Sequence, residues 1–127
     1  MGEHQEALTL TVNAIDAQHR GGKFLYMPAL FRMKGFILAS RSAEDYVEAE
    51  GSLLSAIDWA KRQSATLFEL KAATDLAELL LKQDRVPEAC KYLRAAFDRT
   101  PAGIVSPDHK RALQVLSQLQ SGTEPVG

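Results

Sequence analysis

One short run of residues has the composition of a phosphate-binding loop, Gly21-Gly22-Lys23. A loop of that kind also needs glycine at position 17 and a hydroxyl residue at position 24, to cradle phosphate and hold magnesium. The chain has Ala17 and Phe24 at these positions. The run therefore predicts the end of a helix followed by a turn, not a nucleotide site.

His4, His19 and His109 are the side chains with the chemistry of metal ligands or proton carriers. No two of them stand four residues apart, the spacing that places two ligands on one helix face. We therefore expect all three to be surface histidines. Cys90 has no CxxC partner and lies on an apolar helical stripe, which favours a small buried residue over a reactive thiol. The sequence predicts no metal and no cofactor.

Asp16, Asp58 and Asp98 recur along the chain and have the chemistry of an acid/base cluster. Stacked helix layers would separate them by roughly 10 Å, too far for an acid/base pair. No serine or threonine stands in a nucleophile elbow or a triad order. We expect the lone Trp59 to pack between helix layers, with exposure at an interface as the alternative. The sequence therefore predicts a protein that is not an enzyme.

The composition is that of one ordinary globular domain. The 127 residues are 46% hydrophobic and 24% charged, which argues against disorder. A formal net charge of −1 gives no bulk attraction to nucleic acid or an anionic membrane, so we expect neither as a partner. No apolar run approaches the ~20 residues that span a bilayer, and the polar N-terminus lacks the pattern of a secretory signal. With a single cysteine, these features predict a cytoplasmic location.

Three segments share one pattern, residues 7–16, 49–58 and 89–98. Each begins with Ala, has a second Ala seven residues later, and ends with a large apolar residue and Asp. The second Ala falls at Ala14, Ala56 and Ala96, so the spacings are 42 and 40 residues. Such spacing is typical of stacked helical hairpins. The apolar residues recur at i, i+3, i+4 and i+7, which predicts helices rather than strands.

These patterns predict an all-α fold with six helices. Residues 42–45 and 66–69 have the pattern of N-terminal capping boxes, while Pro87 and Pro107 suit the first turn of a helix. Pro28 either starts the second helix or kinks it. The predicted helices are residues 3–19, 25–40, 43–63, 66–83, 86–99 and 107–120, followed by a flexible tail at 121–127.

The stretch from Leu70 to Gly103 resembles one tetratricopeptide (TPR) unit. The residues that match the pattern of that family are Ala73, Leu76, Ala77, Leu80, Ala89, Leu93, Ala96 and Pro101. At the position of Ala73, the family more often has tyrosine or tryptophan. The resemblance implies stacked antiparallel hairpins in a right-handed superhelix. One domain, residues 1–120, would comprise a half repeat (3–19), two repeats (25–63 and 66–103) and a capping helix (107–120).

A more particular likeness concerns Met27 to Leu38, which is similar to a segment in the C-terminal repeat regions of large bacterial regulators. Those regulators carry such repeats after a nucleotide-binding ATPase module, often with an adenylate-cyclase or winged-helix DNA-binding domain at the front. The likeness implies a repeat region of a bacterial signalling or transcription regulator. Direct contact with nucleic acid is not expected of it.

In the TPR-like arrangement, the first helix of each unit lines a concave groove. The residues expected there are Ala29, Arg32, Phe36 and Ala39 in the first complete unit, and Lys71, Thr74, Glu78 and Leu81 in the second. The five candidates for binding are Arg32, Phe36, Lys71, Thr74 and Glu78. This mixture suits a peptide or partner helix with acidic and apolar residues, but not a C-terminal carboxylate. The alternative is that these residues are solvated or contact a neighbouring domain.

The sequence thus predicts a non-catalytic protein-interaction module. Homo-oligomerisation through the half repeat at 3–19 is the first alternative, because an unpaired helix favours dimers. A small-ligand site between helices is the second, and no constellation of residues favours it. The basic face formed by Arg85, Lys91, Arg94 and Arg99 is expected to be solvated, with docking to an acidic surface as a secondary possibility.

Overall fold

A computed structural model describes residues 2–101, 103 and 106–123 of the chain. Within these residues the protein has six α-helices, one 3-10 turn and no strand, which confirms the predicted all-α fold. The helices are α1 (Gly2–Gly21), α2 (Met27–Arg41), α3 (Tyr46–Arg62), α4 (Thr66–Leu81), α5 (Val86–Arg99) and α6 (Pro107–Thr123). None of them is long and apolar enough to cross a membrane.

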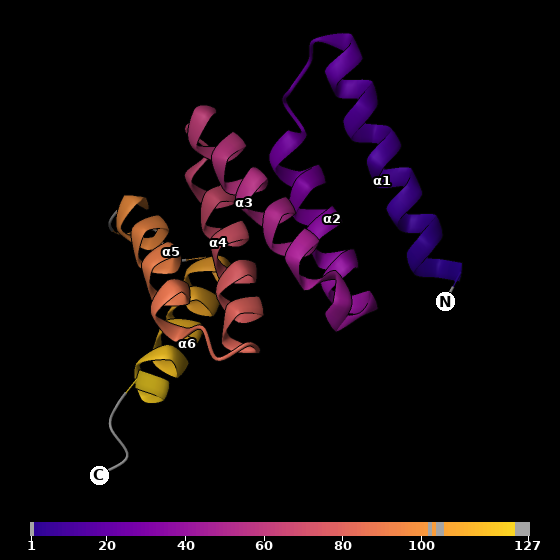
Figure 1. The fold of residues 1–127 in the computed structure, drawn as a ribbon. Helices are drawn as coiled ribbons and strands as arrows, with labels where there is room; N and C mark the ends of the chain where they lie inside the picture. The colour runs from indigo at the N-terminus through magenta and orange to yellow at the C-terminus, as the bar shows by residue number, and fades with distance from the viewer. Residues whose placement is uncertain (1, 102, 104–105, 124–127) are drawn as a thin grey trace.

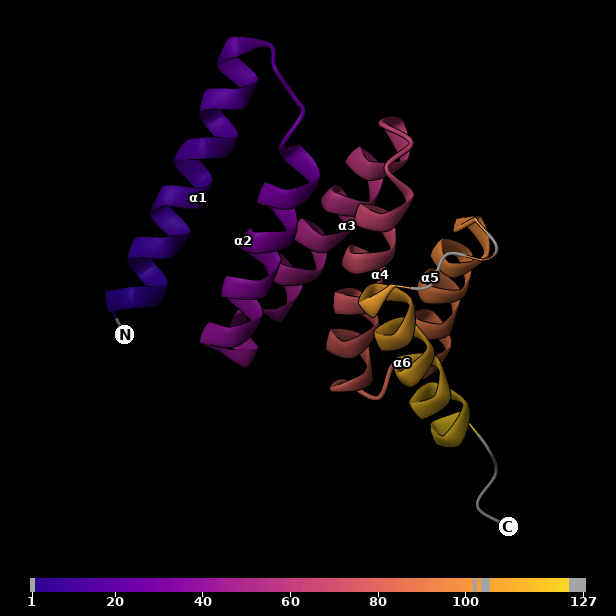
Figure 2. The same ribbon diagram turned by 180° about the vertical axis from the view of Figure 1, so that it is seen from behind.

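Consecutive helices run antiparallel, and the hairpins stack side by side in one array (Figures 1 and 2). The α1 helix lies at one edge of the array and the α5–α6 pair at the other. Among the described elements, α2 packs on α4 and α4 packs on α6, whereas α1, α3 and α5 have no backbone contact with one another. The even-numbered helices are therefore crowded together, as expected for the inner row of a curved helical array.

Three of the connections end a helix with the same hydrogen-bond pattern. After α1, Lys23 N donates to Gln18 O at 3.1 Å and Gly22 N donates to His19 O at 3.2 Å, with Gly22 at φ 66°. This is a Schellman motif, so the predicted helix stop at Gly21-Gly22 is confirmed. Ser64 (φ 55°) and Asp84 (φ 57°) take the equivalent left-handed position after α3 and α4, without being glycine.

The predicted start signals had mixed outcomes. Pro28 lies in the first turn of α2, so it starts that helix instead of kinking it. Ser42 accepts a hydrogen bond from Glu44 N at 3.2 Å, but it caps a 3-10 turn (Ala43–Asp45) that precedes α3. The capping box predicted at 66–69 is wrong, because the residue before α4 is Ala65 and no side chain caps the helix. The carboxylate of Glu69 is used elsewhere, in an ion pair described below.

The core is centred on α4, which α2, α3, α5 and α6 surround. Most residues of α4 are buried, including Ala77, which is fully buried like Ala89 of α5. These small side chains let the two helices approach closely. Cys90 is only half-buried and packs against the edge of this core. The core therefore fixes the positions of the even-numbered helices, which form the inner row of the array.

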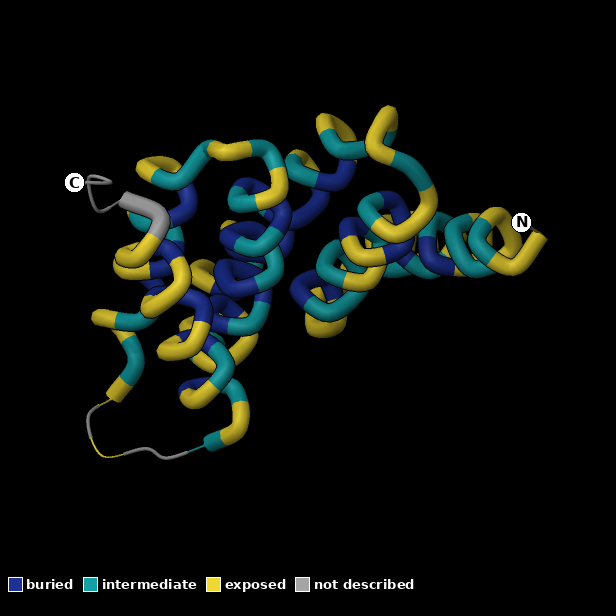
Figure 3. The backbone as a smooth tube through the Cα atoms, turned by 90° about the horizontal axis from the view of Figure 1, so that it is seen from below, coloured by how far each residue is buried: buried dark blue, intermediate teal, exposed yellow. Residues whose placement is uncertain are grey.

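The two ends of the array differ from the prediction in detail. The backbone of α1 packs on α2 alone among the described helices, and only Thr11 and Ile15 of α1 are buried. Figure 3 accordingly shows the tube near the N-terminus mostly in the colours of intermediate and exposed residues. At the other end, α6 continues to Thr123, three residues into the predicted tail. Residues 124–127 of that tail lie outside the described part of the chain.

Candidate functional site

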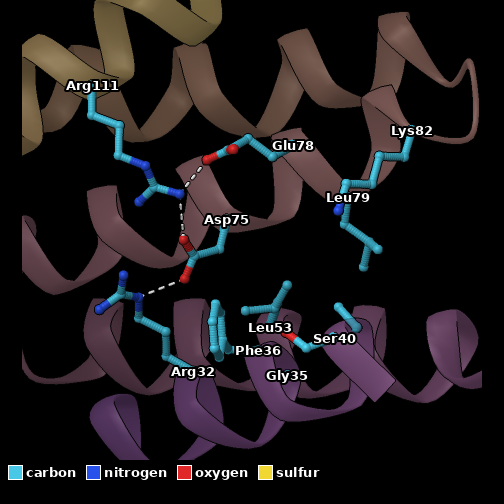
Figure 4. Close-up of a pocket in the computed structure, with 11 residues that line it drawn as sticks. Arg32, Gly35, Phe36, Ser40, Leu53, Asp75, Glu78, Leu79, Lys82 and Arg111 are labelled. Carbon is cyan, nitrogen blue, oxygen red and sulfur yellow. Dashed lines mark hydrogen bonds and ion pairs between the residues drawn. The ribbon is translucent and has the colours of Figure 1, made fainter. Parts of the chain in front are cut away.

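The inner row of helices borders a hollow of about 330 Å³ between α2, α4 and α6 (Figure 4). The hollow is an open groove and not an enclosed cavity. Leu53 of α3, Leu79 of α4 and Phe36 of α2 supply apolar lining, and charged side chains line much of the rest. We call this surface the inner groove and define it by Arg32, Phe36, Asp75, Glu78, Lys82 and Arg111.

Asp75, near the middle of α4, links the three helices of the inner groove. One of its carboxylate oxygens accepts a hydrogen bond from Arg32 Nε at 2.6 Å, and the other accepts one from Arg111 Nη2 at 2.7 Å. The same Arg111 nitrogen also donates to Glu78. Because the Asp75 side chain is only 12% exposed, water screens these bonds less than it screens surface ion pairs. One carboxylate therefore connects α2, α4 and α6.

The charges of the inner groove nearly cancel. Burial lowers the pKa of Arg111, but the hydrogen bonds and charges of Asp75 and Glu78 outweigh burial and raise the pKa above its ordinary value. Arg111 is therefore always charged, and so is Arg32, as arginines in proteins are. Two arginines face two carboxylates. Lys82 adds a further cation that has no ion pair within the described residues.

Phe36 is the largest apolar group on the groove, and 65% of it is exposed. It borders the main hollow and also a second one of about 270 Å³, which Ala29, Arg32, Met33 and Asp75 line with it. An exposed phenylalanine between two hollows is unfavourable for a protein that presents it only to water.

Gly35 explains how α2 is held so close to α3 at the edge of the groove. A Cβ atom added to Gly35 would lie 2.7 Å from Leu53 Cγ and 3.2 Å from the Ala49 carbonyl oxygen. Real Cβ atoms do not approach other atoms this closely, so only glycine allows the observed approach. The neighbouring Phe36 therefore lies on a helix, α2, that packs closely against α3.

Three of the five predicted binding residues line the inner groove, and two do not. Arg32, Phe36 and Glu78 lie where they were expected. Thr74 is a correction: it is 1% exposed, and its hydroxyl donates to Leu70 O at 2.7 Å inside α4. Lys71 lies outside the described groove, with its Nζ 3.8 Å from Asp108 and 5.3 Å from the ring centre of Phe68.

The error in α4 is a shift of register. The TPR-like pattern places positions 71, 74, 78 and 81 toward the groove, whereas the structure places Asp75, Glu78, Leu79 and Lys82 there. Helices pack on α4 from several sides, so only a narrow stripe of it is left open. The polar residues at 75, 78 and 82 recur at i, i+3 and i+7, and the residues between them, 76–77 and 79–81, are all apolar. This polar pattern in the sequence could have identified the exposed side of α4.

The basic residues predicted to form a solvated outer face are partly neutralised. Arg85 donates to Glu50 at 2.6 Å and also pairs with Glu88, and these hydrogen bonds raise the pKa of Arg85. Arg99 binds Glu69 through Nε at 2.8 Å, and this carboxylate is 3% exposed. These two arginines therefore connect helices instead of forming a free basic surface.

The other candidates for chemistry stand apart from the inner groove. His109 is 8% exposed, with Nδ1 3.0 Å from Ser106 Oγ and its ring edge-on to Phe97, so the predicted surface position is wrong. Asp16, Asp58 and Asp98 are exposed. No group of three or more histidine, cysteine or acidic side chains in the described part of the chain is arranged to hold a metal ion.

Comparison of the chain with protein-family models, with curated proteins and with solved structures found no match.

Proposed function

We propose that this protein is a protein-interaction module that binds a segment of its partner in the inner groove and acts by binding rather than by catalysis. The observation that carries the proposal is Phe36, 65% exposed between two hollows on a row of tightly held helices. Aromatic side chains on rigid elements are the usual anchors of protein interfaces. The fixed charges around Phe36 supply the polar rim that such an anchor requires.

The partner segment is expected to carry two apolar side chains. The α2 residues that line the two hollows are centred about one helical turn apart, so the hollows lie ~6 Å from each other along α2. Side chains at i and i+4 of a helix, or at i and i+2 of an extended peptide, have about this separation. An acidic residue beyond them would reach Lys82, the cation of the groove without an ion pair among the described residues.

The wider assignment is a proposal as well. Antiparallel hairpins, the crowded even-numbered helices and the fully buried Ala77 and Ala89 support membership of the TPR type. The likeness of residues 27–38 to bacterial regulators supports a role as the repeat region of a cytoplasmic signalling or transcription regulator, whose partner is a protein or a neighbouring domain.

Site-specific photo-crosslinking tests the groove directly. A photoreactive phenylalanine analogue at Phe36 of the full chain, expressed in cells, should give discrete crosslinked partner bands. The matched control carries the same analogue at Val47, which is 85% exposed on α3 and does not line the groove. Phe36→Ser should weaken binding of the identified partner at least tenfold with unchanged thermal stability. Equal crosslinking at both positions would refute the groove.

A second candidate function is self-association through α1. The observation in its favour is that α1 packs on a single helix and leaves Leu10 64% exposed. Light scattering over a hundredfold range of concentration distinguishes the two functions. A monomer throughout would leave the groove as the remaining candidate, and a dimer abolished by Leu10→Glu but not by Phe36→Ser would favour self-association.

A further inference from the structure

A second surface lies at the corner where the connection from α1 to α2 meets the end of α3. The ring of Phe24 stacks on Trp59 with centroids 5.1 Å apart and an interplanar angle of 24°. His19 meets both rings edge-on, at 5.8 and 6.5 Å. Gln63 Nε2 donates to the Phe24 carbonyl at 2.6 Å and so ties the connection to α3. These contacts hold the aromatic groups in one arrangement.

The two residues that follow Phe24 are left in solvent. Leu25 is 70% exposed and Tyr26 is 61% exposed, beside the stacked pair. Burying an apolar residue such as Leu25 is favourable, so its exposure is a cost to the isolated chain. The Arg62 guanidinium carbon lies over the Trp59 ring, 5.0 Å from its centre. Tryptophan, tyrosine and arginine are the residue types that dominate binding energy at interfaces.

This corner is also basic. Arg20 lies in the last turn of α1, Lys23 follows that helix, and Lys61 and Arg62 end α3, all of them exposed. Arg62 pairs with Asp58 at 3.0 Å, but Arg20, Lys23 and Lys61 have no ion pair within the described residues. Cations in the last turn stabilise a helix, which accounts for those on α1 and α3. Lys23 lies beyond the end of α1, where that account does not apply.

The corner surface is defined by Arg20, Lys23, Phe24, Leu25, Tyr26, Trp59, Lys61 and Arg62. We propose that it docks an acidic protein segment that inserts an apolar side chain beside Leu25 and Tyr26. This surface is separate from the inner groove, since none of its residues lines either hollow. The unpaired cations select an acidic partner and exclude a second copy of the same surface by charge repulsion. The pinned rings reduce the ordering cost of binding.

An anionic membrane is the competing occupant, and the magnitudes favour a protein. Each basic residue near an anionic bilayer adds only a modest attraction, so Arg20, Lys23 and Lys61 together would hold the protein there weakly. Only Leu25 and Tyr26 project for insertion, while Phe24 and Trp59 are already packed on each other. A protein segment can use the faces and edges of all four side chains at once.

The test is selection of random twelve-residue peptides displayed on phage against the full chain. Acidic peptides with one or two large apolar residues should be enriched. Trp59, the only tryptophan, lies in the surface, so its fluorescence measures the affinity of a selected peptide directly. The double variant Leu25→Ser, Lys23→Glu changes two exposed residues, should keep the helical circular dichroism of the parent, and should weaken binding at least tenfold.

The matched control is Phe36→Ser with Lys82→Glu, which alters the inner groove and should leave binding at the corner within twofold of the parent. Enrichment of no peptides, or of peptides without acidic residues, would overturn the proposal. Loss of binding in the groove variant alone would also overturn it, while supporting the proposed function. Phosphatidylserine-containing vesicles that bind the parent but not the corner variant, with no peptide enriched, would assign the surface to a membrane.

Discussion

Replacing Asp75 with alanine removes the group that joins the three inner helices. The two oxygens of its carboxylate hold Arg32 at 2.6 Å and Arg111 at 2.7 Å. After the substitution, two guanidinium groups remain close together, with Glu78 as the single carboxylate still paired to Arg111. Both arginine side chains are about a third exposed, at 34% and 38%, so water partly compensates for the lost partner.

The expected loss of stability is about 3 kcal/mol. Each charge-assisted hydrogen bond is worth ~1.5–3 kcal/mol when buried, and the partial exposure of the arginines reduces this to about 1 kcal/mol each. Repulsion between two cations ~6 Å apart in an effective dielectric of ~50 adds about 1 kcal/mol. For a domain of this size, a loss of 3 kcal/mol lowers the melting temperature by roughly 10 °C.

Urea unfolding followed by circular dichroism measures this loss, with Asp58→Ala as the matched control. Asp58 is also an aspartate in an ion pair with an arginine, but its side chain is 59% exposed and its partner Arg62 is 63% exposed. The control should lose less than about 0.5 kcal/mol, as exposed pairs within one helix do. If Asp75→Ala costs no more than Asp58→Ala, the view that Asp75 holds the inner helices together is refuted.

Three further substitutions follow from the packing. Gly35→Ala should lower the free energy of unfolding by about 1 kcal/mol, because overpacking against Leu53 outweighs the gain in helix propensity; stabilisation in thermal unfolding would contradict this. Asp84→Gly should raise the free energy of unfolding by about 0.5–1 kcal/mol, since glycine takes the left-handed φ of 57° without strain. A lower free energy of unfolding in urea would show that the contacts of the aspartate side chain outweigh this strain. Arg99→Ala should cost about 3 kcal/mol, because it strands the buried Glu69 carboxylate. The double variant Glu69→Met, Arg99→Leu should recover most of that loss by the same measurement, and an uncorrected loss would point to packing of the Arg99 stem instead.

The helices were predictable because local signals set them. Periodic apolar residues, the glycine pair at 21–22 and the prolines act within a few residues of themselves, so each helix was placed to within about three residues at its ends. Ser64 and Asp84 could not be recognised as left-handed residues, because neither residue type demands that conformation. The role of Glu69 was missed because its partner, Arg99, lies 30 residues away.

The residues of the inner groove were predictable only where the pattern of a single helix determined which side chains are exposed. Arg32 and Phe36 were placed correctly because residues 33, 36 and 40 stay exposed on α2, on the side that the repeat pattern assigns to the groove. Thr74 was misplaced because neighbours crowd α4, and a threonine can satisfy its hydroxyl on its own helix, as Thr74 does on Leu70 O. Arg111 was missed because α6 was predicted as a cap, and its contact with Asp75 depends on tertiary packing alone.

The two proposed surfaces differ in whether their charges are already paired, so the salt dependence of binding distinguishes them. In the inner groove, arginines and carboxylates already satisfy one another, so its selectivity rests mainly on the hollows beside Phe36. At the corner, Arg20, Lys23 and Lys61 have no ion pair among the described residues, so a partner there gains electrostatic attraction. Screening shortens the range of that attraction from ~10 Å at 0.1 M salt to ~3 Å at 1 M. Raising the salt concentration from 0.1 M to 1 M should therefore weaken binding at the corner several-fold more than binding in the groove. A larger loss of affinity in the groove than at the corner would contradict both assignments.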